Sequence, residues 1–131
     1  MLSEATSLRD TLFDRLGGAE GIAALIDDVV TAHTENALIK SRFLPYLKDP
    51  ARLAVIKKHT CQLLAAGGGG PTLYEGRSMK ETHAGMNVSA AEYVAATDDI
   101  LLALRGRNLD EQTQKDVLWM VYSLKADIVH G

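Results

Sequence analysis

Apolar residues recur every three or four positions along most of the chain, and this spacing is the feature that most limits its fold. Between residues 18 and 33 the apolar positions follow the sequence i, i+3, i+4, i+7 and i+8, at Ile22, Leu25, Ile26, Val29 and Val30. This pattern predicts an amphipathic helix that buries one face. Similar stripes cover 50–66, 89–106 and 108–128, and no segment alternates with a period of two. The chain is therefore predicted to be all-α.

Glycine and proline mark the first helix boundaries. Gly17 and Gly18 end a short helix predicted over Ser7–Leu16, because glycine tolerates the backbone angles of a helix end. Pro45 is expected to limit helix between residues 37 and 47. Asp49 followed by proline predicts the cap and first position of the helix over 50–66.

Three further motifs divide the second half of the chain. Ser89-x-x-Glu92 and Asn108-x-x-Glu111 have the spacing of capping boxes, which predicts the starts of the last two helices. Four consecutive glycines, Gly67–Gly70, are costly to order, so they are predicted to form a flexible joint.

Length and charge exclude several classes of protein. A chain of 131 residues fits one domain, here 12–131, after an N-terminal arm over 1–11 that includes the start of the short helix. The formal net charge is −3 without a basic stripe, so nucleic acid is not an expected partner. No apolar run approaches the ~20 residues of a membrane span. Without a signal-peptide core near Met1, the expected location is the cytoplasm.

The stretch 74–86 carries the strongest chemical signal. As a helix it would place Met79, Thr82, His83 and Met86 on one face, with Arg77 and Lys80 on the flank. An imidazole on an apolar face with cations beside it suits a haem, because iron needs a nitrogen donor and the propionates need positive charge. The alternative is a core histidine without a ligand.

The remaining polar residues offer fewer sites. No zinc or di-iron motif is present, and the single Cys61 is expected to be an inert thiol. Asp98 and Asp99 are expected on a solvated face. His33 is expected to act as a cation at a helix C-terminus, and His130 to be exposed. His59 lies beside an apolar face and remains a second candidate ligand.

The chain resembles a known family over Leu12 to about Val129. The residues that carry this resemblance are Leu16-Gly17-Gly18, Phe43 and the run Gly69-Gly70-Pro71-x-x-Tyr74-x-Gly76-Arg77-x-Met79-Lys80-x-x-His83, which together resemble the group I truncated haemoglobins. The resemblance implies a two-over-two helical sandwich with haem between segments 50–66 and 74–86. It implies that His83 is the proximal iron ligand and that Phe43 packs on the haem. Tyr74, Arg77 and Lys80 would lie near the propionates, with Met79 on the haem-facing side.

The positions on the distal side of the haem, opposite His83, depart from the family pattern. Members that hold oxygen tightly usually carry a tyrosine and one or two glutamines where this chain has Val30, Ile56 and Thr60. A missing charge-assisted hydrogen bond costs roughly 1.5–3 kcal/mol, so fast oxygen release and easy oxidation are expected. His59 matches the position of a sixth iron ligand in cyanobacterial members. The alternative is that its imidazole reaches the haem edge or solvent.

Three other aromatic residues are candidate replacements for the missing phenol. Tyr46, Trp119 and Tyr122 could each reach the distal side, although Trp119 and Tyr122 are expected to be core or helix-packing residues. The function predicted from the resemblance is binding of a diatomic gas, namely oxygen, nitric oxide or carbon monoxide. The alternatives are a haem redox enzyme with an external reductase, acting on nitric oxide, nitrite or peroxide, and a cofactor-free helical interaction domain.

Overall fold

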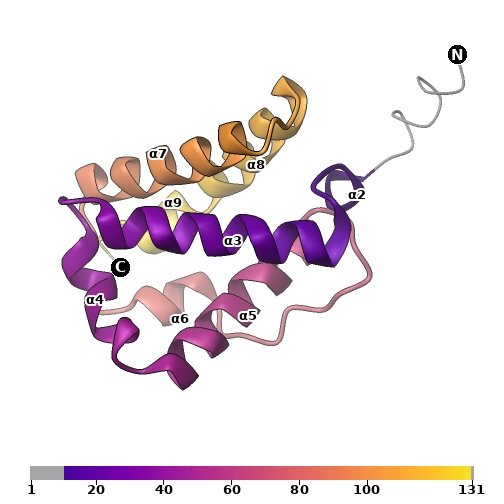
Figure 1. Ribbon diagram of the computed structural model, residues 1–131. Helices are drawn as coiled ribbons and strands as arrows, with labels where there is room; N and C mark the ends of the chain where they lie inside the picture. Colours follow the sequence, from indigo (N-terminus) through magenta and orange to yellow (C-terminus); the bar gives the residue numbers. More distant parts are fainter. Residues whose placement is uncertain (1–10, 131) are drawn as a thin grey trace, which may run out of the picture.

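The computed structural model describes residues 11–130, and most of them are helical (Figure 1). The N-terminal arm and the part of the predicted first helix over 7–10 lie outside the described residues. The helices are α2 (Leu12–Arg15), α3 (Gly18–Glu35), α4 (Lys40–Leu47), α5 (Pro50–Gly67), α6 (Met79–His83), α7 (Ala90–Gly106), α8 (Glu111–Ser123) and α9 (Lys125–Ile128). The predicted all-α fold is confirmed. Within the described part, each helix is too short or too polar to cross a bilayer.

The long helix α3 forms the middle of the molecule. In Figure 1, α5 and α6 lie on one side of α3, and α7 and α8 lie on the other. Helix α3 packs closely against both α5 and α7. Its predicted stripe supplies the centre of a core whose buried apolar members are Leu12, Leu16, Ile22, Leu25, Ile26, Val29, Leu64, Ala65, Ala103, Leu104 and Val117.

Capping explains most helix starts. Asp49 caps α5 by accepting a hydrogen bond from the Arg52 amide, with Pro50 at the first helical position, as predicted. The Ser89 capping box also forms, and opens α7. The predicted cap at Asn108 is wrong. Asp110 caps α8 instead, because its carboxylate accepts from the Thr113 amide at 3.2 Å while Asn108 adopts a left-handed turn conformation.

Helix α4 contains the proline that was expected to limit it. Pro45 lies inside Lys40–Leu47 and removes the hydrogen bond that its amide would otherwise donate to the carbonyl of Ser41. Both Ser41 and Pro45 are exposed, so water can reach the unpaired carbonyl. This access to water explains why one short helix tolerates the proline.

The glycine run is a fixed turn, and the prediction of a flexible joint is wrong. Gly67 still belongs to α5, and the carbonyl of Gly68 accepts a hydrogen bond from the Phe13 amide at 2.9 Å. The Gly70 amide donates to the Ala65 carbonyl at 2.8 Å. A Cβ atom on Gly70 would stand 2.5 Å from the Phe13 ring and 3.0 Å from that carbonyl oxygen. Glycine is therefore required by the close approach of α2 to the end of α5.

An ion pair fastens α4 to the start of α7. The Arg42 guanidinium donates to both carboxylate oxygens of Glu92, and also to the Met86 carbonyl at 3.1 Å. Glu92 closes the Ser89 capping box as well. The hydrogen bond from Arg42, followed by that from the Ser89 backbone, lowers the pKa of Glu92 to about 2.

We predict that the Glu92 carboxylate stabilises the fold in a pH-dependent way. Because its pKa is lowered by folding, the stabilisation is present above the ordinary value of 4.5 and is lost as the pH falls towards about 2. Glu92→Gln keeps a side chain suited to the capping box but removes the charge. We expect it to lower the free energy of unfolding by about 1–2 kcal/mol at pH 7. Urea titrations should show the two proteins converging between pH 4.5 and 2; a constant difference would contradict the assignment.

Candidate functional site

The segment that leads to His83 is held by its own side chains. The Tyr74 hydroxyl donates to the Arg77 carbonyl at 2.6 Å, and Ser78 caps α6 by accepting from the Glu81 amide at 3.1 Å. The helix covers Met79–His83, whereas residues 74–78 are not helical. The predicted helix over 74–86 is therefore too long, because the cap at Ser78 fixes its start.

The ring orientation of His83 is set by one hydrogen bond. Its Nδ1 atom lies 2.9 Å from the carbonyl oxygen of Met79, one turn earlier in α6. Since a carbonyl oxygen only accepts, Nδ1 carries a proton, and in the neutral imidazole the lone pair then lies on Nε2. An imidazole fixed in this tautomer is prepared to bind a metal through Nε2.

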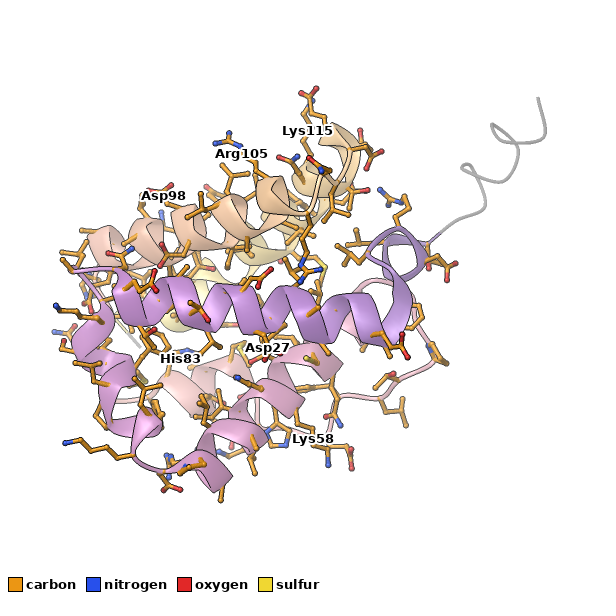
Figure 2. The ribbon with its side chains drawn as sticks, in the orientation of Figure 1. Asp27, Lys58, His83, Asp98, Arg105 and Lys115 are labelled. Atoms are coloured by element: carbon orange, nitrogen blue, oxygen red, sulfur yellow. The ribbon has the colours of Figure 1, made fainter. Side chains whose placement is uncertain are left out.

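Helix α6 is supported by the C-terminal part of the chain. Helix α6 packs against α9, and it does not pack closely against α5. The C-terminal segment holds the turn after α6, since the His130 amide donates to the Val88 carbonyl at 2.8 Å and His130 Nδ1 lies 2.9 Å from Asn87 Oδ1. His83 lies below α3 in Figure 2, on the same side as α5.

The donor set around His83 fits a haem. Within residues 11–130, no group of three or more His, Cys, Asp or Glu side chains could hold a metal ion by itself. A haem iron needs one axial donor from the protein, because the porphyrin supplies four nitrogens. Arg77 and Lys80 are exposed, and neither has an ion-pair partner in the described part of the chain. Both cations remain available to propionates.

The three predicted distal positions offer no free hydrogen-bond donor. Val30 and Ile56 are half-buried aliphatic side chains on α3 and α5. The Thr60 hydroxyl donates to the Ile56 carbonyl within α5 at 2.8 Å, as threonine often does in helices. The predicted single hydroxyl is thus occupied by its own helix.

His59 and Tyr74 contact each other. Their rings meet edge to face, with centroids 6.2 Å apart and an interplanar angle of 74°. The Tyr74 hydroxyl, which was expected to lie toward the propionates, is already bonded to the Arg77 carbonyl. His59 is half-buried in α5, so its ring rests against the segment that precedes α6.

The ring of Phe43, which was expected to pack on the haem, stacks on His33. The ring centroids of Phe43 and His33 are 4.8 Å apart, and the planes meet at 27°. His33 is only 8% exposed, and its Nδ1 lies 2.8 Å from Oδ2 of Asp99, which is 7% exposed. The expectation of a solvated Asp99 is wrong, because α3 and α7 pack together at this point. His33 does lie in the last turn of α3, but it is buried against the Asp99 carboxylate.

Asn36 completes this buried cluster. Its amide nitrogen donates to the two Asp99 carboxylate oxygens at 3.0 and 3.1 Å. A signal for the cluster was present in the sequence. His33 continues the apolar stripe of α3 four residues after Val29, and Asp99 falls between two buried alanines at the same spacing, Ala95 and Ala103.

The other aromatic candidates lie elsewhere. Trp119 is 69% exposed and Tyr122 is 66% exposed, so neither is the packing residue that was expected. Trp119 lines a pocket of about 420 Å³ between α2, the end of α5 and α8, and none of the predicted haem-binding residues lines that pocket. The ring of Tyr46 lies under the Arg52 guanidinium, 5.5 Å from the ring centroid.

We predict that Asp99 contributes strongly to stability. Asp99→Ala would leave His33 and Asn36 buried without their partner, so we expect unfolding free energy to fall by about 2–4 kcal/mol. Asp98→Ala is the matched control, because Asp98 is exposed on the same helix (Figure 2) and should change stability by less than about 0.5 kcal/mol. Thermal or urea unfolding of both variants measures the difference. Equal effects would contradict the buried cluster.

Comparison with known proteins agrees with this arrangement. The sequence model of the family described as "Bacterial-like globin" matches residues 11–130. A Group 1 truncated hemoglobin GlbN from Nostoc sp. (strain MUN 8820) is 26% identical over 120 residues, covering 92% of this chain and 98% of the relative.

Solved structures show the same fold. The truncated hemoglobin from Tetrahymena pyriformis in its Fe(III) form superposes with a TM-score of 0.83 at 19% identity, covering 93% of this chain and 100% of that one. The 2/2 hemoglobin from Synechococcus sp. PCC 7002, with covalently attached heme, gives a TM-score of 0.79 at 19% identity and covers 92% of this chain and 98% of that one. The chain therefore belongs to the bacterial-like globin family and has the truncated, two-over-two globin fold.

Proposed function

We propose that this globin binds a diatomic gas at a haem held by His83. The observation that carries the proposal is the hydrogen bond from His83 Nδ1 to the Met79 carbonyl, since it leaves Nε2 as a donor on a helix that does not pack closely against α5. The haem supplies the iron at which the gas binds. Arg77 and Lys80 would pair with the propionates, and Phe43 and Met79 would pack on the ring.

The distal residues make oxygen the least firmly held of the candidate gases. Val30 and Ile56 donate no hydrogen bond, and the Thr60 hydroxyl is engaged with the Ile56 carbonyl. Oxygen gains more than carbon monoxide from a nearby donor, because it carries more negative charge when bound. This pocket therefore favours reversible gas binding over a reaction that requires oxygen to stay bound, such as nitric oxide dioxygenation.

A reductase and a cytoplasmic location are parts of the same proposal. A pocket without distal donors lets the iron oxidise easily, so a source of electrons is needed to keep the protein able to bind oxygen.

His59 is proposed to rest against Tyr74 and to leave the sixth coordination position of the iron open. The edge-to-face contact between the two rings supports this proposal.

The proposal predicts that His83→Ala abolishes stable haem binding. We expect the wild-type protein mixed with haemin to show a Soret band, and the variant to lose the haem to an acceptor protein at least tenfold faster. Circular dichroism controls for folding, and added imidazole should restore part of the spectrum. Unchanged haem retention in His83→Ala would refute the assignment of His83 as the residue that holds the haem. In the wild type, a low-spin ferric spectrum that turns high-spin in His59→Ala would show instead that His59 occupies the sixth position.

A second prediction concerns the distal side. Val30→Tyr returns a phenol to the position where oxygen-holding members of the family carry one. We expect it to slow oxygen release roughly tenfold to hundredfold, as a charge-assisted hydrogen bond of about 1.5–3 kcal/mol requires. Val30→Phe is the matched control, because it adds the ring without the hydroxyl. Stopped-flow measurement of the two off-rates tests the idea, and equal rates in both variants would refute it.

A further inference from the structure

Charge is distributed very unevenly along this chain. Eight of the fourteen Lys and Arg residues, but two of the seventeen Asp and Glu residues, lie between residues 40 and 80. That segment has a formal charge of +6, whereas the whole chain has −3, so the remaining residues carry −9. The small net charge conceals a strongly polarised molecule, and the expectation of a chain without a basic stripe is wrong.

The fold collects this segment on one side. It comprises α4, α5 and the first residues of α6, which lie on the α5 side of the molecule in Figure 1, and the glycine turn, which lies against α2. Helices α7 and α8 lie on the opposite side of α3. In Figure 2, Lys58 marks the lower edge, while Asp98, Arg105 and Lys115 mark the upper edge. We call the surface formed by residues 40–80 the basic face.

Most of the cations on the basic face point their charge into solvent. Five of them are exposed and have no carboxylate within 4 Å in the described part of the chain, namely Lys40, Lys48, Arg52, Arg77 and Lys80. The segment's own two acids are both engaged. Asp49 caps α5, and Glu75 accepts from the Gln62 amide at 2.6 Å and lies 3.9 Å from Lys58.

The basic face adjoins the proposed haem site. Arg77 and Lys80 precede His83 by six and three residues, and α4 and α5 carry Phe43, Ile56 and His59. Arg42 and Lys57 are paired with Glu92 and Asp27, which lie outside this segment. If two propionates pair with Arg77 and Lys80, three unpaired cations remain on this face, namely Lys40, Lys48 and Arg52. A partner that approaches the haem edge therefore meets a positive surface.

We propose that the basic face docks an acidic electron-transfer protein, of the flavin or iron–sulfur class, which returns one electron to the ferric haem. This inference rests on the proposed function, because a pocket with aliphatic Val30 and Ile56 favours oxidation of the iron. The donor loses one electron and the ferric iron gains it, with no transfer of atoms. Charge complementarity would raise the association rate and orient the donor toward the haem edge.

A protein partner fits this surface better than a nucleic acid does. The described residues outside the basic face, 11–39 and 81–130, have a formal charge of −8. A long polyanion would extend from the face onto this acidic flank and be repelled. A compact acidic protein can contact the positive surface alone.

The test uses the haem-loaded protein and reduced flavodoxin as an acidic one-electron donor. Lys48→Glu combined with Arg52→Glu reverses two charges on the basic face without altering the residues proposed to hold haem. Arg105→Glu combined with Lys115→Glu is the matched control, since it changes the net charge equally on the opposite edge (Figure 2). Stopped flow gives the bimolecular reduction rate, and calorimetry gives the Kd for oxidised flavodoxin, a binding readout that needs no electron transfer.

At about 0.01 M salt, where screening is weak, we expect Lys48→Glu combined with Arg52→Glu, the basic-face pair, to lower the bimolecular reduction rate roughly tenfold. The affinity for oxidised flavodoxin should fall by a similar factor. The control pair should change either quantity less than about threefold, and salt near 0.3 M should remove the difference. Equal effects of the two pairs, or none, would overturn the docking surface while the Soret band stays intact. Binding of a short DNA duplex that the basic-face pair abolishes would also overturn it. Absence of a Soret band in the wild type would instead refute the proposed function.

Discussion

Both layers of this globin depend on the burial of one helix face. The apolar stripe of α3 contacts α5 on one side and α7 on the other, and its side chains Ile22 and Leu25 are almost completely buried. Burying a leucine or isoleucine stabilises a protein by about 1.5–3 kcal/mol. Because the same stripe serves two interfaces, a change in α3 alters the positions of α5 and α7 together.

The candidate haem site combines a prepared donor with an inert opposite face. His83 is oriented by the Met79 carbonyl, so the helix itself selects the nitrogen that can bind iron. Across from it, the hydroxyl of Thr60 is engaged by its own helix. The polar groups of this region are instead gathered at His33 and Asp99, where they join α3 to α7 behind the Phe43 ring.

The sequence predicted those parts of the structure that follow from local spacing. Helical periodicity gave the all-α fold, and Asp49 with Pro50 gave the start of α5 because a cap acts within one turn. The His33–Asp99 pair was missed because it joins residues 66 positions apart, and periodicity does not report which two stripes meet. The glycine turn was misjudged for a related reason, since only the approach of Phe13 to Gly70 reveals why glycine is needed. The roles of His83, His59 and the distal residues remain predictions.

The contact between α6 and the C-terminal residues has a consequence for biosynthesis. A helix of five residues is not stable by itself, because helix nucleation in so short a segment is unfavourable. Its support comes from α9 and from His130, which bonds to residues 87 and 88. Both α9 and His130 lie more than forty positions after α6 in the chain. A ribosome releases the chain from its N-terminus onward, so α3 and α5 emerge long before this support exists. Helix α6 therefore gains this support only after residues 125–130 have left the ribosome, later than α3 and α5.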